Sequence, residues 1–363
     1  EDIGVFQRIG ESTDVVRKEM YDFHDKGGRH IALRPEGTAS VARAFVEHRP
    51  TVPFKAWYAT PSFRYEAPQA GRFRQHHQLG VEAIGSSDPD LDVEVIALLV
   101  EFHRAAGVAQ FTLRLTSLGD DVCRPAYRAL LEAHLATTEL CGEHTTRYKD
   151  NPLRVFDCKR PECVAATKDA PVQVEHLCEP CTAHYQRVKA GLDALGIAYE
   201  EDRRLVRGLD YYTRTTFEFS PVGVDAAQNA IGGGGRYDKL IEELGGPSTP
   251  GIGFGVGIER ELLAIGDAAT PSAIRVFVVD TTGGEHARDL TALLRTHGIA
   301  ADRAFDQRSL KAQLKAADRA GAAVALIIGP DEATNQTVTV RDLTNGEQRQ
   351  VPRADVLAEL TNQ

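Results

Sequence analysis

The chain contains two kinds of strand pattern that do not fit a single sheet. Residues 111–115 (FTLRL) alternate apolar and polar side chains, which is typical of a strand with one buried face. Residues 274–280 (IRVFVVD) and 323–329 (AVALIIG) are largely continuous apolar runs with helical patterns between them, as in a buried parallel sheet. The sequence therefore predicts an α+β domain with an antiparallel sheet, followed by a small α/β domain.

The boundary between these domains is expected near residue 271. Residues 266–272 include Gly266, Asp267 and Pro271, a composition typical of a linker. A chain of 363 residues is also too long for one core, because single cores stop growing at roughly 250 to 300 residues. We predict domains at 1–271 and 272–363. Residues 124–200 are helix-rich and interrupt β-rich sequence, which predicts a helical insertion in the first domain.

Composition and charge exclude several classes of protein. Apolar residues make up 42% and charged residues 26%, which is ordinary for a globular protein and argues against disorder. The net charge of −10 argues against a general electrostatic grip on nucleic acid, so any such contact must be local. No stretch of about 18 apolar residues occurs, so we expect a soluble, cytoplasmic protein without a membrane segment. Because Met20 is the only Met, we expect that the chain begins in mid-protein or was processed.

Residues 63–85 (FRYEAPQAGRFRQHHQLGVEAIG) are unusually rich in polar groups. If 63–66 and 75–84 are paired strands, Arg64 lies at a strand end and Arg72 on the turn between them. Two guanidinium groups placed in this way suit a polyphosphate, because Arg binds phosphate oxygens in a bidentate manner. Gln78 and Glu82 share one strand face and suit a cationic amine or an imidazole N–H. An exposed hairpin with ordinary charges is the alternative.

Three further segments contain polar or glycine-rich motifs. Residues 205–218 (LVRGLDYYTRTTFE) cluster an arginine, an aspartate and two tyrosines around a glycine. Residues 232–238 (GGGGRYD) would allow a ligand close to the backbone, although glycine-rich turns are more often only turns. Residues 251–260 (GIGFGVGIER) predict a strand of small residues that leads into a helix with Arg260 in its first turn. This strand would leave room for a purine, or it packs tightly against a helix.

In this order, these motifs resemble those of the histidyl-tRNA synthetase family, within class II of the aminoacyl-tRNA synthetases. Residues 63–66 and the loop that follows are similar to class II motif 2, and residues 251–260 to motif 3. The segments LVRGLDYY and GGGGRYD resemble the histidine-specific signatures, and LRPEGT (33–38) belongs to the same family pattern. The resemblance covers nearly the whole chain. It implies a class II catalytic domain and a C-terminal anticodon-binding domain.

The resemblance also implies a role for each matching residue. Glu36, Thr38 and Gln78 would hold the α-amino group of histidine, and Glu82 and Tyr212 would bind its imidazole, with Tyr211 beside them. Arg207 and Arg64 correspond to the catalytic arginines near the α-phosphate and the substrate carboxylate. ATP would be bound by Arg64 and by three other residues, Glu66 at the adenine amino group, Arg72 at the outer phosphates and Arg260 on the purine.

The implied reaction has two steps and needs no nucleophile from the enzyme. Histidine and ATP, with Mg²⁺, give histidyl-adenylate and pyrophosphate, and the adenylate then acylates the 3′ end of tRNA(His). Positioned arginines and Mg²⁺ can lower such barriers by electrostatic stabilisation. A site that hydrogen-bonds both ring nitrogens would reject analogues by about 4 to 5 powers of ten, so no editing site is expected.

A basic stripe in the C-terminal domain is a candidate tRNA contact. Residues 309–322 predict a helix, on which the basic residues would form one stripe while Leu310, Leu314 and Ala317 face away. The stripe comprises Arg308, Lys311, Lys315 and Arg319. It would follow phosphates or, alternatively, be an ordinary solvated helix face.

The chain departs from the family pattern in two places. Class II motif 1, which forms much of the expected homodimer interface, should lie mostly before Glu1, with only its tail at residues 5–23. The second departure is the set of six cysteines, which all lie between Cys123 and Cys181. The ligand-like spacing of two pairs predicts a structural tetrathiolate Zn²⁺ site, with unligated thiols as the alternative. The proposed ligands are Cys158, Cys163, Cys178 and Cys181.

Two other functions are compatible with a synthetase-like core. One is a catalytically inactive paralogue that regulates histidine biosynthesis, and the other is an RNA- or nutrient-sensing module. The regulatory paralogues typically lack the anticodon domain and the second histidine signature, and this chain has both. The presence of Arg64, Arg207 and Arg260 argues against a degenerate sensor.

Overall fold

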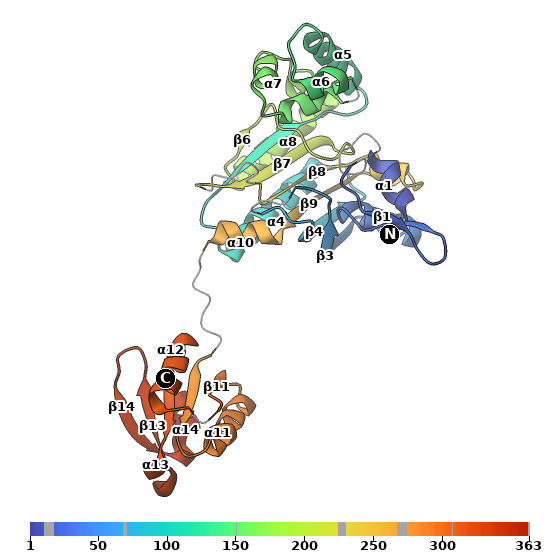
Figure 1. Ribbon diagram of the computed structural model, residues 1–363. Helices are drawn as coiled ribbons and strands as arrows, with labels where there is room; N and C mark the ends of the chain where they lie inside the picture. Colours follow the sequence, from blue (N-terminus) through green and yellow to red (C-terminus); the bar gives the residue numbers. More distant parts are fainter. Residues whose placement is uncertain are drawn as a thin grey trace. The chain divides into compact units, whose positions relative to one another are not determined.

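The computed structural model describes residues 1–10, 18–67, 71–149, 151–223, 230–266, 274–306 and 308–361. The chain divides into two compact units, Glu1–Gly266 and Asp267–Gln363 (Figure 1). The predicted boundary at 271/272 falls within residues 267–273, which lie outside the described residues.

The first unit is built on a sheet with the strand order β3-β4-β9-β8-β7-β5-β6. All neighbouring pairs are antiparallel except β5 and β6, which pair in parallel. The predicted antiparallel sheet is therefore confirmed, and so are the strands expected at 75–84 and 111–115. The bounds are β3 Phe54–Phe63, β4 Gln75–Ile84, β5 Phe111–Ser117, β6 Glu200–Glu201, β7 Thr213–Pro221, β8 Gly232–Arg236 and β9 Gly251–Gly257.

Two long helices, α4 (Pro89–Ala106) and α8 (Glu179–Ala194), pack together against this sheet. The side chain of Asp88 caps α4 by accepting a hydrogen bond from the Asp90 N–H at 3.0 Å. The buried Asp92 of α4 binds Arg236 of β8 at 2.6 Å and His184 of α8 at 2.8 Å. This network fixes both helices to the middle of the sheet. The shorter α10 (Ile258–Ile265) follows β9 directly.

A second core forms at the end of the sheet that carries β3 and β4. It packs α1 (Ile3–Gly10), α3 (Thr38–His48) and α9 (Leu240–Glu243) around buried aromatic residues, among them Phe6, Phe45, Tyr211 and Tyr237. A small sheet of β1 (Asp22–His24) and β2 (His30–Ala32) lies next to α1. The predicted motif 1 tail at 5–23 coincides with this region, but residues 11–17 of it lie outside the described residues.

Helices occupy most of the segment between β5 and β6. They are α5 Arg124–Leu135, α6 Gly142–Arg147, η1 Pro152–Asp157, α7 Pro161–Ala166, η2 Gln173–Glu175 and α8. The part from α5 to α7 forms a small core of its own around Tyr127, Leu131 and Val155, and it stands apart from the sheet in Figure 1. We call residues 124–177 the insertion. The last helix, α8, belongs by its packing to the main core.

The second unit is a five-stranded sheet with the order β11-β10-β12-β13-β14. The first three strands are parallel, as the apolar runs predict, and β13 and β14 add an antiparallel hairpin that the sequence analysis did not identify. The strands are β10 Val276–Asp280, β11 Ala301–Arg303, β12 Val324–Ile328, β13 Thr337–Asp342 and β14 Gln348–Pro352. The helices are α11 Glu285–Thr296, α12 Leu310–Arg319, α13 Pro330–Asn335 and α14 Val356–Thr361.

Candidate active site

Glycines in β9 leave room for polar side chains that project from β4. Glu82 is paired with Gly253 in the β4–β9 register, and a Cβ atom at Gly253 would overlap the Glu82 carboxylate. A Cβ atom at Gly255 would likewise overlap the amide of Gln78. Glycine at these positions therefore lets the two predicted residues Gln78 and Glu82 extend across the neighbouring strand, on the same face of the sheet.

Glu82 lies at the centre of a buried cluster of hydroxyl groups. Its Oε2 accepts a hydrogen bond from Tyr237 at 2.5 Å, and its Oε1 accepts one from Thr38 at 2.7 Å and one from Tyr58 at 3.4 Å. Burial raises the pKa of Glu82 to about 8, although these donors act in the opposite direction. The carboxyl group is therefore poised to ionise when a cationic or N–H donor enters the site.

Glu36, Thr38 and Tyr211 form the wall next to Glu82. The carboxylate of Glu36 accepts hydrogen bonds from the N–H groups of Thr38 at 2.7 Å and Ala39 at 2.9 Å, which are the first two of α3. Tyr211 donates to the same carboxylate at 3.4 Å. Glu36 thus fixes the start of α3 and the position of the Thr38 hydroxyl, which contacts Glu82 directly.

Arg207 lies over β8 and beside the aromatic wall. Its guanidinium is paired with Glu218 of β7 at 2.7 Å and stands 5.9 Å from the ring centre of Tyr212. A Cβ atom at Gly233 would lie 2.9 Å from both terminal nitrogens, so the glycine of β8 makes room for the guanidinium. The Arg207 Nε atom is buried and has no hydrogen-bond partner within the described residues.

The other three predicted arginines meet at the ends of β3, β4 and β9. Arg64 donates to the Pro35 carbonyl at 2.9 Å, and Arg260 donates to the carbonyl groups of Gly71 at 2.8 Å and Ala230 at 3.1 Å. Arg72 forms an ion pair with Glu66 at 2.5 Å. Burial and the positive charges of Arg72 and Arg64 lower the pKa of Arg260, so these groups share one electrostatic environment.

Glu218 connects this arginine group with Arg207. It is the ion-pair partner of Arg207, and its negative charge also acts on Arg260. The structure therefore brings all predicted catalytic, histidine-binding and ATP-binding residues to one region of the sheet. This region combines the buried carboxyl groups of Glu36 and Glu82 with a concentration of guanidinium groups. This arrangement suits a small cationic amino acid next to a polyphosphate.

Comparison with known proteins identifies the family. Residues 7–260 match the family described as Histidyl-tRNA synthetase, and residues 274–363 match an anticodon-binding domain. The chain belongs to the histidyl-tRNA synthetase family. It is 51% identical to a protein of Rhodococcus erythropolis named Histidine--tRNA ligase, over 99% of this chain and 87% of the relative. A relative of the same name from Nocardia farcinica is 49% identical, over 100% of this chain and 88% of the relative.

A solved structure supports the same conclusion at the level of the fold. The crystal structure of apo histidyl-tRNA synthetase from S. aureus matches with a TM-score of 0.77 and 37% identity, over 99% of this chain and 88% of that chain. The family resemblance and the class II fold predicted from the motifs are confirmed. The prediction of an anticodon-binding domain at the C-terminus is confirmed by the match over residues 274–363.

The structure adds three residues that the sequence analysis did not assign to the site. They are Tyr58, Tyr237 and Glu218. Strand alternation could have indicated Tyr58 in part. Tyr58 is paired with Gly80, and this register brings its ring next to Glu82. Tyr237 belongs to the GGGGRYD segment, but its partner Glu82 lies 155 residues away, a separation that only the folded sheet bridges.

The insertion borders the active site at the segment that carries Arg207. Arg154 of η1 donates to the Gly208 carbonyl at 2.6 Å, and Asn151 donates to the Asp210 carboxylate at 2.9 Å. A cavity of about 340 Å³ lies at this junction, and its lining includes Arg124, Arg154, Arg207 and Tyr212. The position of Arg207 therefore depends in part on contacts from the insertion.

The predicted tetrathiolate site is wrong. Cys158 and Cys163 lie in one cluster with Cys141 and His144, whereas Cys178 and Cys181 lie in another with Asp120 and Cys123. The cause is the path of the chain: Cys178 and Cys181 lie at the start of α8, which packs in the main core, while Cys158 and Cys163 belong to the separate core of the insertion.

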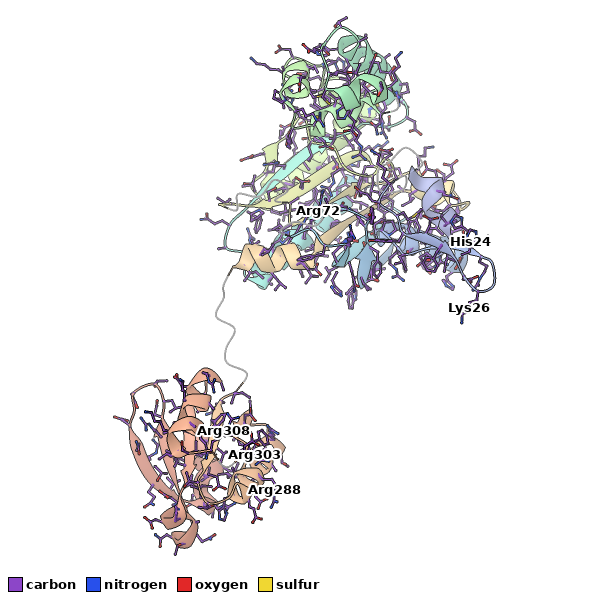
Figure 2. The ribbon with its side chains drawn as sticks, viewed as in Figure 1. His24, Lys26, Arg72, Arg288, Arg303 and Arg308 are labelled. Atoms are coloured by element: carbon purple, nitrogen blue, oxygen red, sulfur yellow. The ribbon has the colours of Figure 1, made fainter. Side chains whose placement is uncertain are left out.

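The basic stripe of the second unit differs in part from the prediction. Lys311, Lys315 and Arg319 are exposed on α12, but Arg308 precedes the helix, whose N-cap is Ser309. Leu310 was expected to face inward and is 43% exposed, because Gln313 and Ala317 are the residues of α12 that face the core. Figure 2 shows three arginines close to one another in this unit, Arg288, Arg303 and Arg308, and they line a cavity of about 260 Å³.

Within the described part of the chain, no helix is both long and apolar enough to cross a membrane.

Proposed function

We propose an assignment of the site residues to the two steps of the histidine–tRNA ligase reaction. The chain is a histidine–tRNA ligase, an ATP-dependent enzyme that activates L-histidine and transfers it to the 3′ end of tRNA(His). The proposal rests on one observation above all. Four arginines from separate parts of the chain are linked electrostatically through Glu218 and one another, and one of them, Arg207, acts on Tyr212 together with the buried Glu82.

The pocket around Glu82 binds histidine. Glu82 accepts a hydrogen bond from a ring N–H of the imidazole, and Tyr212 binds the ring from the opposite side. Gln78 offers a buried Oε1 atom that has no hydrogen-bond partner in the described part of the chain, and this atom accepts from the α-ammonium group. Thr38 and Glu36 complete the amine site, and Tyr211 orients Glu36.

The arginines bind ATP, which enters with Mg²⁺. Arg64 holds the α-phosphate, Arg72 binds the outer phosphates and Arg260 stacks on the purine, while Glu66 accepts from the adenine amino group. Mg²⁺ is commonly bound by one or two carboxylates together with substrate phosphates. Glu218 would be a suitable carboxylate, because it contacts Arg207 and its charge also acts on Arg260, two of the arginines assigned to the site.

In the first step, a carboxylate oxygen of histidine attacks the α-phosphorus. An O–P bond forms as the bond to the β-phosphate oxygen breaks, and its electron pair leaves with pyrophosphate. Arg207 and Arg64 stabilise the charge that develops at the α-phosphate, and no proton needs to pass through the protein. In the second step, a ribose hydroxyl of the tRNA attacks the activated carbonyl carbon. The bond from that carbon to the phosphate oxygen breaks, and AMP leaves with the hydroxyl proton on its phosphate.

The second unit binds tRNA(His), and two copies of the chain form a homodimer in the cytoplasm. The negative total charge restricts RNA contacts to local basic surfaces. The α12 residues Lys311, Lys315 and Arg319 form one such surface, and the cavity of Arg288, Arg303 and Arg308 forms another. The edge strand β3 exposes Trp57, which is 74% accessible and is available for a dimer contact.

Histidine-dependent exchange of pyrophosphate into ATP tests the assigned reaction. The purified chain is expected to support exchange with histidine and ATP·Mg²⁺, and to acylate tRNA(His). A regulatory paralogue or a sensor would bind histidine without exchange. Exchange without acylation would support the assignment of the first unit and contradict that of the second.

A further inference from the structure

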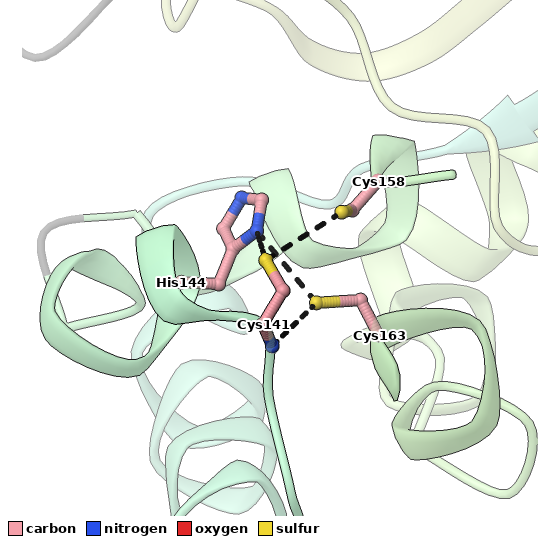
Figure 3. Close-up of side chains that lie close together, drawn as sticks. All are labelled: Cys141, His144, Cys158 and Cys163. Atoms are coloured by element: carbon pink, nitrogen blue, oxygen red, sulfur yellow. Dashed lines mark hydrogen bonds between the residues drawn. The ribbon is translucent and has the colours of Figure 1, made fainter. Parts of the chain in front are cut away.

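Four donor atoms in the insertion point toward a common centre (Figure 3). Cys141 precedes α6 and His144 lies within it, Cys158 follows η1, and Cys163 lies in α7. One donor atom from each side chain lies within 4.8 Å of the others. The residues thus come from three separate elements, so their meeting is a property of the fold and not of one local turn.

Three distances in this cluster are close to the edges of a coordination tetrahedron. For Zn–S and Zn–N bonds of about 2.3 and 2.1 Å, the edges of a tetrahedron are about 3.8 Å between sulfurs and about 3.6 Å between sulfur and nitrogen. The Cys141 and Cys158 sulfurs are 3.9 Å apart, and His144 Nδ1 lies 3.2 Å from Cys141 Sγ and 3.7 Å from Cys163 Sγ.

A disulfide does not explain the cluster. A disulfide bond is about 2.05 Å long. The Cys141–Cys158 separation of 3.9 Å is nearly twice as long, and all six cysteines, each within the described residues, are free. The backbone N–H of Cys141 also donates to the Cys163 sulfur at 3.4 Å. Such outer contacts commonly orient metal-binding thiolates.

A second cluster lies where the insertion meets the sheet. Asp120 Oδ1 is 3.6 Å from Cys123 Sγ and 3.7 Å from Cys178 Sγ, and Cys181 completes the group, with all four donor atoms within 4.8 Å. A tetrahedral zinc with one carboxylate oxygen has sulfur–oxygen edges of about 3.6 Å. The other oxygen of Asp120 is held by Arg214 of β7 at 3.3 Å.

We propose that the chain binds two structural zinc ions, one at Cys141, His144, Cys158 and Cys163 and one at Asp120, Cys123, Cys178 and Cys181. Each site has four protein ligands, which is typical of structural rather than catalytic zinc. The first zinc links three elements that share only a small core. The second links the start of the insertion to α8 and, through Asp120 and Arg214, to β7. The inference goes beyond the ligase reaction and does not depend on it.

Metal analysis of the purified full chain, expressed without a metal-binding tag, tests the proposal. About two equivalents of zinc per chain are expected. Cys158→Ser and Cys178→Ser should each retain about one equivalent, and the double variant none. The control His176→Ala should retain two, because His176 stacks on Tyr127 in the same segment but belongs to neither cluster.

These variants distinguish two separate zinc sites from a single site that uses both pairs of cysteines. If Cys158→Ser alone removed all zinc, Cys158 and Cys178 would belong to a single centre and the proposal would be overturned. One equivalent of zinc or less in the parent protein after zinc supplementation, or iron in its place, would overturn it as well.

A ligand exchange keeps the proposal testable if the serine variants do not fold. His144→Cys preserves four ligands and should retain two equivalents, whereas His144→Ala should lose one. Replacement of zinc by Co²⁺ should give the visible bands of tetrahedral thiolate coordination. His144→Cys should shift those bands, because a sulfur replaces a nitrogen. Unchanged bands in His144→Cys would contradict ligation by His144.

Discussion

The active-site sheet and the insertion hold their functional side chains by different means. In the described part of the chain, the main core contains 20 buried residues from the sheet, α4, α8 and the adjoining loops, whereas the insertion core contains seven, of which two are cysteines. In a large core, close packing fixes the positions of strands and helices, and therefore also those of the charged side chains that they carry. A small core needs an added constraint such as a metal.

The two regions also differ in what their functional residues contact. Residues of the sheet region contact the substrates, whereas residues of the insertion contact other protein residues. Strand β4 presents Glu82 and Gln78 directly to the site, and the arginines lie in segments that adjoin the strands of the sheet. The insertion reaches the site through Arg154 and Asn151, which contact the segment of Arg207. Arg124 of α5 also donates to the Tyr212 carbonyl at 3.0 Å. We therefore expect variants of the sheet residues to alter chemistry or binding strongly, and variants of the insertion to have weaker, indirect effects.

Arg207→Ala is expected to have the largest effect. Its guanidinium acts where charge develops in the transition state, and removal of one such donor costs roughly 100- to 1,000-fold in kcat. Pyrophosphate exchange should fall by about that factor, while the Kd for histidine changes much less. Arg203→Ala is the matched control, because Arg203 is an exposed arginine of the same segment, paired with Glu175. Equal losses in kcat and affinity would contradict a transition-state role.

Glu82→Gln should weaken histidine binding. A hydrogen bond to a charged group contributes about 1.5–3 kcal/mol, so the KM for histidine should rise about 10- to 150-fold in exchange assays. The KM for ATP should remain unchanged, because Glu82 lies on the side of the site away from the arginines. A similar rise in the KM for ATP would remove Glu82 from the histidine pocket.

The sequence predicted the active site on the sheet better than the cysteine clusters of the insertion. In the sheet, alternation alone predicted that Gln78 and Glu82 share a face, and the family motifs identified the arginines. The partners Tyr237 and Glu218 could not be predicted, because strand order and register decide which distant residues meet. No local sequence pattern predicts the order of the antiparallel strands.

In the insertion, the spacing of the cysteines predicted the wrong set of ligands, because spacing describes only residues that are neighbours along the chain. Cys178 and Cys181 form a plausible ligand pair by spacing, and so do Cys158 and Cys163. Nothing in the spacing reveals that α8 packs against α4, which carries the second pair away from the first. His144 and Asp120, the ligands that are not cysteines, were missed for the same reason.

The pH dependence of stability should separate Glu82 from exposed acids. Burial raises its pKa to about 8 from an ordinary value of 4.5, so the folded protein binds a proton that the unfolded chain releases. Its contribution to stability is full below about pH 4.5 and is lost as the pH rises through 8. Without histidine, Glu82→Gln should therefore gain unfolding free energy relative to the parent between pH 5 and 8.

This gain should reach at most about 1.4 kcal/mol per pH unit, the value for one proton. Urea unfolding of both proteins at several pH values measures it. Glu36 is also buried with a raised pKa and is present in both proteins, so it contributes to the difference only through its electrostatic coupling to Glu82. Glu242→Gln, which changes an exposed acid of α9, should leave the pH dependence unchanged. Parallel curves for Glu82→Gln and the parent would show that Glu82 is already ionised.

Arg154→Ala should have the smallest effect, because its hydrogen bond to the segment of Arg207 is to a backbone carbonyl and not to the guanidinium itself. It removes the hydrogen bond to the Gly208 carbonyl, and a typical hydrogen bond contributes about 0.5–1.5 kcal/mol, so exchange should fall about 2- to 12-fold. Arg160→Ala, an exposed arginine of the insertion, is the control. If zinc acts on catalysis through η1, Cys158→Ser should lower exchange less in the Arg154→Ala background than in the parent. Additive losses would mean that the insertion supports Arg207 by a route other than η1.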